Sequence, residues 1–350
     1  MLICMMNDNF YRSSGAAIAI KRISQALTDV DYCVAGCADN DELSEDLSWV
    51  PAGKYERFDL KASNPIRIMS ELTRFKKWFR TQGCDLVHCH HRRLSVLLQT
   101  AGIPVLYTGQ FAFRYATWFR WLRPRRMTAI SPSVARNLIE TTGREAVACI
   151  GNPAQFPETP PVIQLEKVKA KAVCIARLEP VKGHKNLLAA WKVLHDRGSR
   201  YELNLVGEGS LRSELEAQTR RDGTQDLIHF RGFTADVTSI VNECLFAVLA
   251  SEMEGQGIVT LEAAAAGRAS LLTAVPGSID LLPPGQRLPN GVQFGDVEAL
   301  ADALEEWFAH PSVVAEEGAR FFHFLKSSSD PSNIAREYTR VYQQILTGII

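Results

Sequence analysis

Short apolar runs alternate with helix-length amphipathic stretches along most of this 350-residue chain. The runs have the length and composition of buried strands, and stretches such as 16–30 and 66–83 have the spacing of amphipathic helices. Strand and helix in regular alternation predict parallel sheets covered by helices on both faces. The predicted strands are 2–6, 32–36, 85–89, 104–108, 127–131 and 146–150 in the first half, and 172–176, 202–206, 227–230, 245–250 and 269–274 in the second.

The alternation is interrupted once, at residues 153–167, PAQFPETPPVIQLEK, which contain four prolines. Proline-rich stretches of this kind predict a linker, and the chain is longer than one hydrophobic core usually supports. We therefore expect two doubly wound domains, residues 1–155 and 169–330, joined by a linker over 156–168. The amphipathic segment 331–350 predicts a closing helix that packs back onto the first domain.

Composition excludes several classes of protein. The 39 Lys and Arg residues balance 39 Asp and Glu residues, which argues against a nucleic-acid binder. No apolar run approaches the ~20 residues of a membrane span, and residues 1–10, MLICMMNDNF, lack the basic start of a signal peptide. The eight cysteines form no CxxC pair and lie mostly in apolar runs, which predicts buried free thiols in a reducing compartment. We expect a cytoplasmic protein.

Ligands of doubly wound sheets bind where the strands end and loops lead into helices. The loop after strand 172–176 contains Arg177 and Lys182, and these two cations suit a diphosphate. A pair of solvated surface charges is the alternative. The loop after strand 202–206 contains Gly207 and Gly209, which permit a phosphate or ribose to approach closely but also mark ordinary turns.

The loop after strand 245–250 begins the stretch SEMEGQGIVTLEAAAAGR, residues 251–268. Glu254 and Glu262 lie on either side of a glycine-rich turn, and a carboxylate can accept hydrogen bonds from adjacent sugar hydroxyls. The turn exposes backbone N–H groups at a helix start, where the dipole favours anions. The alanines that follow let this helix pack close against its sheet.

The ordered combination of these motifs resembles the retaining family 4 glycosyltransferases (glycosyl transferases group 1). The best matching stretches are RLEPVKG (177–183), LVGEGSLRSELE (205–216), FRGF (230–233) and SEMEGQGIVTLEAAAAGR (251–268), followed by GSIDLL (277–282) and GDVEALADALEEWFAHP (295–311). The looser matches are SSGAAIAIKRISQAL (13–27), DLVHCH (85–90), TAISPSVARNL (128–138) and CIGNPAQF (149–156). The resemblance covers nearly the whole chain. It implies a GT-B architecture, in which two doubly wound Rossmann-like domains face a central cleft, the first binding the acceptor and the second the nucleotide-sugar.

The resemblance also implies roles for the donor-site residues. Arg177 and Lys182 would hold the donor diphosphate, and Glu262 would accept hydrogen bonds from the ribose hydroxyls. Glu254 would position the donor sugar together with the amides that follow it, those of Gly255, Gln256 and Gly257.

Five further residues receive roles by resemblance or from their loops. Gly207 would allow close approach of the donor, and Gly232 and Phe233 would lie beside the nucleobase. In the first domain, Gly15 would face the cleft and His90 would reach the sugar.

The chain departs from the family pattern at several points. Ser14-Gly15 stands where a glycine pair is usual, and Thr108-Gly109-Gln110 stands where the family has Thr-x-His. Gly267-Arg268 replaces Gly-Pro, and Pro276-Gly277 replaces Gly-Gly. None of these changes removes a donor-contacting residue, whereas the change at Gln110 alters a polar contact near the acceptor.

The family resemblance implies a same-face, internal-return transfer in which the departing phosphate helps to deprotonate the acceptor, with no metal ion and no cofactor. We expect a UDP-sugar donor, with GDP- or ADP-sugar as alternatives. Two DxD sequences are present, but Asp29–Asp31 is expected to straddle a helix end and Asp39–Asp41 to lie in a polar loop, so we expect neither to bind a metal. A zinc site around Cys84 and residues 88–91 is disfavoured, because His88 and His90 share one strand face and Cys89 points to the other.

Two other functions compete with glycosyl transfer. A nucleotide-sugar 2-epimerase shares the two-domain architecture and would use acidic and histidine residues on the sugar. A non-catalytic homologue would bind nucleotide-sugar without transferring it, although the intact donor-site residues argue against this.

The acceptor is suggested by residues 111–126, FAFRYATWFRWLRPRR, which contain six aromatic residues and five arginines. Rings mixed with arginines suit contact with an anionic membrane. The patch would be widened by Lys76, Lys77, Trp78 and Arg80. A helix with aromatics in the core and solvated arginines is the alternative. We expect a glycan or glycolipid acceptor of the bacterial cell surface, at the cytoplasmic face of the inner membrane.

Overall fold

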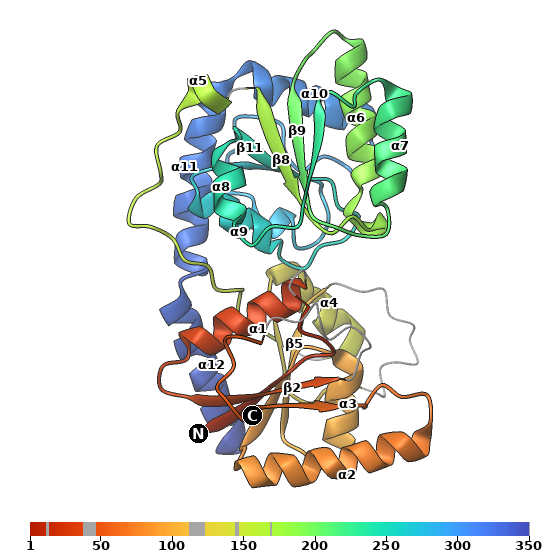
Figure 1. Cartoon of the computed structure of the whole chain (residues 1–350). Coiled ribbons are helices and arrows are strands. Elements are labelled where there is room, and N and C mark those ends of the chain that lie inside the picture. The colour runs from red at the N-terminus through yellow and green to blue at the C-terminus, as the bar shows by residue number, and fades with distance from the viewer. Residues whose placement is uncertain (12–13, 38–46, 112–122, 144–146, 169, 350) are drawn as a thin grey trace. The chain divides into compact units, whose positions relative to one another are not determined.

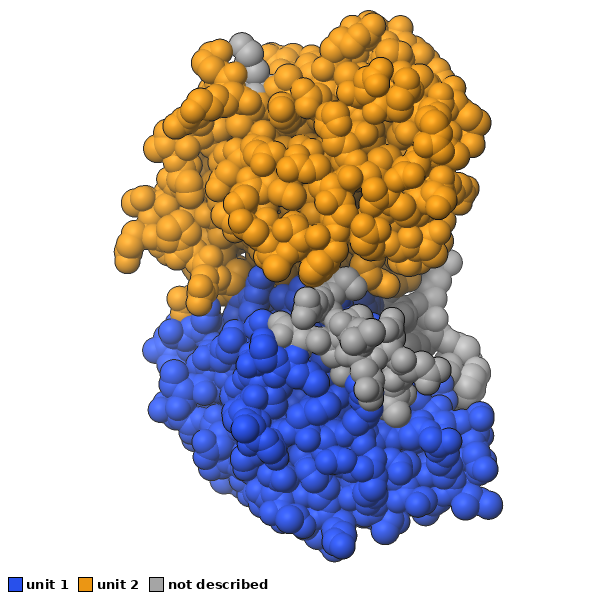
Figure 2. Space-filling model, in the orientation of Figure 1, with its two compact units in different colours: residues 1–153, 331–350 blue, residues 154–330 orange. Residues whose placement is uncertain are grey.

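The computed structural model describes residues 1–349 except 12–13, 38–46, 112–122, 144–146 and 169. The chain divides into two compact units, which Figure 2 shows in separate colours. Unit 1 consists of Met1–Pro153 and Pro331–Ile350, and unit 2 consists of Ala154–Asp330. The expected linker, residues 156–168, is thus grouped with unit 2, and the closing helix is grouped with unit 1.

The described part of unit 1 contains a seven-stranded parallel sheet in the order β3-β2-β1-β4-β5-β6-β7. Its strands are β1 (Leu2–Met6), β2 (Asp31–Cys37), β3 (Tyr55–Phe58), β4 (Leu86–Cys89), β5 (Val105–Gly109), β6 (Met127–Ala129) and β7 (Ala148–Cys149). Its helices are α1 (Gly15–Ala26), α2 (Pro65–Gln82), α3 (Arg92–Thr100), α4 (Pro132–Thr142) and α12 (Pro331–Leu346), as Figure 1 shows.

The side-chain alternation of β1 divides the core of unit 1 into two layers, because successive residues of a strand point to opposite faces. Ile3 and Met5 pack in one cluster with α1 and with Tyr338 of α12. Cys4 and Met6 pack in the other cluster with α2 and α3. The sheet is therefore apolar on both faces, as the uninterrupted run LICMM predicts.

The described part of unit 2 contains a five-stranded parallel sheet in the order β10-β9-β8-β11-β12. Its strands are β8 (Lys171–Ile175), β9 (Glu202–Val206), β10 (Ile228–Gly232), β11 (Phe246–Leu249) and β12 (Ser270–Leu272). Its helices are α5 (Leu165–Val168), η3 (Pro180–Lys182), α6 (His184–Asp196), α7 (Arg212–Asp222), α8 (Val237–Asn242), α9 (Ile258–Ala265), η4 (Ile279–Leu281), α10 (Val297–Ala309) and α11 (Pro311–Ser328).

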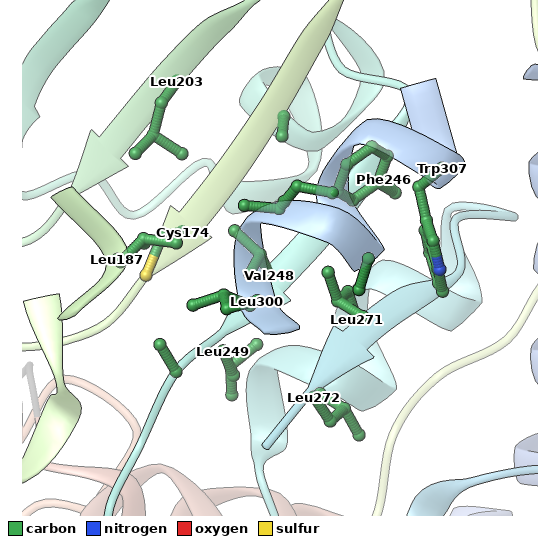
Figure 3. Close-up of a cluster of buried hydrophobic side chains, with 14 of the residues drawn as sticks. Cys174, Leu187, Leu203, Phe246, Val248, Leu249, Leu271, Leu272, Leu300 and Trp307 are labelled. Atoms are coloured by element: carbon green, nitrogen blue, oxygen red, sulfur yellow. The ribbon is translucent and has the colours of Figure 1, made fainter. Parts of the chain in front are cut away.

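The sheet of unit 2 is also covered on both faces. On one face, Cys174 of β8 and Phe246 of β11 pack with Leu187 of α6 and Trp307 of α10 (Figure 3). The rings of Phe246 and Trp307 lie 5.0 Å apart, edge to face. On the other face, Val173 and its neighbours pack against α8 and α9. Two parallel α/β sheets confirm the expected fold class, and every strand predicted from an apolar run is present.

Three local expectations were wrong. The strand β3 was not predicted, because YERF forms an edge strand in which Phe58 is the one fully buried residue. Cys149 is exposed rather than buried, because the two-residue strand β7 forms the other edge of the sheet. Asp29–Asp31 does not straddle a helix end, since α1 ends at Ala26 and Asp31 begins β2.

Other expectations concern a membrane span and segments that lie outside the described residues. None of the helices in the described part of the chain is both long and apolar enough to cross a bilayer. Asp39–Asp41 and residues 112–122 of the aromatic and arginine-rich segment lie outside the described residues.

Candidate functional site

Three loops of unit 2 meet at the carboxyl edge of its sheet, because β8 lies between β9 and β11 and all three strands run parallel. The loops after β8 and β9 are joined by a hydrogen bond from Leu178 N to Glu208 O, 2.9 Å long. The loops after β8 and β11 are joined by a second bond, from Glu252 N to Val181 O, also 2.9 Å long. The three loops selected from the sequence therefore form one surface.

The centre of this surface is an ion pair between Lys182 and Glu254. Lys182 Nζ lies 2.6 Å from Glu254 Oε1, and the two side chains are 17% and 7% exposed. The Ser251 hydroxyl donates to the same carboxylate oxygen at 2.9 Å. A buried carboxylate is tolerated only when it is paired and hydrogen-bonded, so this arrangement holds a negative and a positive charge in fixed positions beside each other.

Arg177 adds a second cation to the same loop. Its side chain is exposed, and it forms no ion pair within the described part of the chain. The neighbouring Glu179 accepts hydrogen bonds from the Ser210 backbone at 3.1 Å and from the Ser210 hydroxyl at 2.8 Å. These bonds, with a smaller contribution from Arg177, hold the pKa of Glu179 below its ordinary value. Glu179 is thus committed to the loop after β9, and the Arg177 guanidinium is available to an anion.

The turn after Glu254 leads into α9. Gly255 and Gly257 are buried and Gln256 is half-buried, and α9 begins at Ile258 without a side-chain cap. Uncapped N–H groups at a helix start can bind an anion or a polarised hydroxyl. Glu262 is half-buried about one turn into α9, and Ala263 and Ala264 beside it are fully buried, as expected for a helix packed closely on its sheet.

The remaining residues predicted to bind the donor lie at the ends of β9 and β10. Gly207 donates its backbone N–H to Gly232 O at 2.8 Å. A Cβ atom at Gly207 would lie 2.1 Å from Ala176 O, in the loop after β8. The close approach of the loops after β8 and β9 therefore requires glycine. Phe233 directly follows β10 and is 46% exposed, which leaves its ring accessible.

Unit 1 contains the two other predicted site residues. Gly15 is the first residue of α1, whose N-cap Ser14 accepts from Ala17 N at 3.4 Å. His90 directly follows β4, is 5% exposed, and donates its backbone N–H to Met6 O at 2.9 Å. Burial lowers the pKa of His90 to about 3, so its imidazole is neutral near pH 7.

His90 packs against a buried polar network. The ring of His88 lies 4.4 Å from that of His90, on the shared strand face predicted from the sequence. His88 Nδ1 lies 2.7 Å from the Tyr342 hydroxyl of α12, and His88 Nε2 lies 2.6 Å from the Thr108 hydroxyl. Burial lowers the pKa of His88 well below its ordinary value, and both ring nitrogens are used within the fold.

Sequence reasoning missed two residues of these sites. Ser251, which holds Glu254, stands three residues before it and could have been selected as a local hydroxyl partner. Gln110, which contacts His90, was noticed only as a departure from the family pattern. Across the described residues, no group of three or more His, Cys, Asp or Glu side chains has an arrangement suited to a metal ion.

Comparison with protein families identifies the chain. Residues 169–310 match the model of the glycosyl transferases group 1, and residues 13–154 match the model of Glycosyltransferase Family 4. The chain is a glycosyltransferase of this group 1, family 4 type. A curated relative, "Putative glycosyltransferase EpsD" of Bacillus subtilis (strain 168), is 25% identical over 304 residues, which is 74% of this chain and 78% of the relative.

Solved structures support the same fold for this glycosyltransferase. HepE of Anabaena, in complex with UDP and glucose, superposes with a TM-score of 0.80 at 16% sequence identity. The superposition covers 97% of this chain and 99% of the HepE chain. Sucrose-phosphate synthase of Thermosynechococcus elongatus superposes with a TM-score of 0.81 at 15% sequence identity. This superposition covers 99% of this chain and 100% of the synthase chain. The two parallel α/β units therefore have the GT-B architecture.

Proposed function

We propose that this glycosyltransferase moves a sugar from a nucleotide diphosphate sugar to an acceptor hydroxyl, with retention of the anomeric configuration and without a metal ion or cofactor. The Lys182–Glu254 pair, with Arg177 beside it, carries the proposal. It combines a carboxylate for sugar hydroxyls with two cations for a diphosphate. HepE was solved with UDP and with UDP-glucose, which favours a UDP-sugar over a GDP- or ADP-sugar.

Each charged residue has a distinct task in this mechanism. Arg177 and Lys182 stabilise the charge that develops on the diphosphate, and one such donor is typically worth ~3 kcal/mol of barrier. Glu254 orients the sugar and Glu262 accepts from the ribose hydroxyls. The bond from the anomeric carbon to the phosphate oxygen breaks as the acceptor oxygen attacks from the same face. The acceptor proton passes to the leaving phosphate oxygen.

The first prediction tests donor and stereochemistry. We expect UDP to raise the melting temperature more than GDP or ADP does, because a ligand that binds only the folded state stabilises it. Glu262→Ala should weaken this shift.

The stereochemistry and the metal requirement are tested with the UDP-sugar identified in this way. NMR of the product should show the donor's anomeric configuration, and EDTA should leave the rate of transfer unchanged. Inversion, or EDTA inhibition that Mg²⁺ or Mn²⁺ reverses, would contradict the mechanism. Release of UDP only when acceptor is present separates transfer from 2-epimerisation.

The acceptor is proposed to be a glycan or glycolipid of the bacterial cell surface, reached at the cytoplasmic face of the inner membrane. The supporting surface is the outward face of α2. Its inward face consists of Leu72, Phe75 and Phe79. Ile66 and Met69 are 80% and 61% exposed, and helical spacing places Lys77 and Arg80 on the same side, both exposed. Apolar and basic residues on one helix face suit an anionic lipid surface.

Two residues of the patch expected from the sequence make contacts within unit 1. Trp78 packs against Phe58 and Phe75, with ring centroids 5.5 and 6.0 Å apart. The Arg123 guanidinium donates to the Thr142 carbonyl. The membrane proposal rests on the outward face of α2.

The second prediction concerns this surface. Replacing Lys77 and Arg80 together by serine should lower the binding constant for anionic liposomes, measured by sedimentation at low salt, roughly 30-fold. Each cation near such a surface contributes ~1 kcal/mol of binding free energy. The matched control removes Arg220 and Arg221, two exposed cations of α7 in unit 2. Equal weakening in both variants would show that net charge, rather than the α2 face, causes binding. Absence of binding in the unmodified protein would favour a soluble acceptor.

A further inference from the structure

The histidine at the end of β4 has a side-chain partner from the end of β5. Gln110 directly follows β5 and is 8% exposed. Its side-chain nitrogen lies 2.8 Å from His90 Nδ1. β4 and β5 are neighbouring parallel strands, so the two residues meet at the carboxyl edge of the unit 1 sheet. This is the edge at which doubly wound domains bind their ligands.

The chemistry of this contact fixes the position of a proton. An amide nitrogen donates and cannot accept, so His90 Nδ1 must be the acceptor. A neutral imidazole carries one N–H, and burial keeps His90 neutral. The proton therefore resides on Nε2.

The Nε2 atom of His90 is itself buried, and among the described residues it has no hydrogen-bond partner. Buried polar groups are almost always satisfied in native proteins. An N–H group left open at a ligand-binding edge, on a side chain that is nearly fully buried, therefore indicates a donor reserved for a ligand oxygen.

We propose that Gln110 is a positioning residue that fixes His90 as the Nε2–H tautomer, so that His90 donates a hydrogen bond to a hydroxyl of the transferred sugar. The assignment of a sugar as the ligand rests on the proposed function, whereas the assignment of the tautomer does not. The amide of Gln110 thus takes the place of the histidine that the family pattern has at this position.

The neighbouring network keeps His90 from turning away. The His88 ring packs against it, and His88 is held by Thr108 and by Tyr342. The Thr108 hydroxyl lies 2.7 Å from that of Thr128 on the next strand. The hydrogen-bonded network thus supports His90 on one side. Gln110 is the group that determines which ring nitrogen of His90 carries the proton.

The tautomer is tested by NMR on the full chain labelled with ¹⁵N-histidine, with the His90 signals assigned through His90→Asn. We expect a pyrrole-type Nε2 and a pyridine-type Nδ1 in the unmodified protein. Gln110→Met keeps the length of the side chain but cannot donate, and should give a mixture of tautomers. Gln110→Glu accepts instead of donating, and should move the proton to Nδ1 or give the imidazolium.

The sugar contact is tested by kinetics with the same variants. Gln110→Met should lower kcat/KM roughly tenfold, the value of about one hydrogen bond. This loss should disappear with the one deoxy-sugar donor that lacks the contacted hydroxyl, a pattern that a purely structural defect would not produce.

The outcomes are separable. A pyrrole-type Nδ1 in the unmodified protein, as a Gln110 amide turned by 180° would give, overturns the positioning role. So does a tautomer that is unchanged in Gln110→Met. The expected tautomer with an equal kinetic loss for every deoxy-sugar overturns the sugar contact alone. If no nucleotide-sugar is turned over at all, the proposed function fails while the NMR result still decides the role of Gln110.

Discussion

Lys182→Ala should lower kcat roughly 10²–10³-fold, because it removes a preorganised cation from the diphosphate as negative charge develops there. It should also destabilise the fold by about 3 kcal/mol, because it leaves the Glu254 carboxylate, 7% exposed, without its counter-ion. Steady-state kinetics and urea unfolding measure the two effects separately.

Two further variants separate the catalytic effect from the structural one. Adding Glu254→Gln to Lys182→Ala removes the unpaired buried charge, so stability should recover while turnover stays low. Arg177→Ala should lower turnover with little change in stability, since Arg177 is exposed. Lys185→Ala is the matched control, because Lys185 lies three residues away and pairs with Glu214 on the surface. Near-normal turnover in both Lys182→Ala and Arg177→Ala would remove these residues from the donor site.

The fold was predictable because its strands are buried on both faces, so each one appears in the sequence as an unbroken apolar run. The exception is the edge strand β3. One side of this strand has no partner and Phe58 is its one buried residue, so YERF carries no recognisable pattern. An edge strand is specified by its neighbour more than by its own composition, which a local reading of the sequence cannot see.

The adjacency of the loops in the candidate site was predictable, but their side-chain contacts were not. Lys182 and Glu254 were both selected from local motifs, yet their pairing across 72 positions depends on the adjacency of β8 and β11 in the sheet. Arg268 illustrates the same limit. It replaces a usual proline, and its buried guanidinium donates to the carbonyls of Cys244, Ala266 and Asn242 near the ends of α8 and α9. A charged residue in a sequence does not reveal that its partners are backbone atoms brought together by the fold.

The loop that presents Lys182 should tolerate no side chain at its next residue. Gly183 ends η3 in the left-handed region, with φ of +68°. A Cβ atom there would lie 1.9 Å from Ala250 O and 3.1 Å from the Phe294 ring. Because Ala250 leads from β11 into the Glu254 loop, the clash can be relieved only by separating the two loops that form the proposed donor site. We expect Gly183→Ala to cost about 4 kcal/mol or more, in the range of exceptional single substitutions.

Gly223→Ala is the matched control for this prediction. Gly223 ends α7 with nearly the same backbone angle, φ of +69°, but an added Cβ would meet nothing closer than His195 Nε2 at 3.9 Å. Its substitution should therefore cost only the left-handed strain of about 1–2 kcal/mol. Urea unfolding of both variants gives the difference, which measures the contact with Ala250. UDP binding, if it is lost in Gly183→Ala but retained in Gly223→Ala, connects that contact to the donor site. Equal destabilisation in the two variants would mean that the loops after β8 and β11 can separate at little cost, and the fixed Lys182–Glu254 geometry would then no longer follow from the fold.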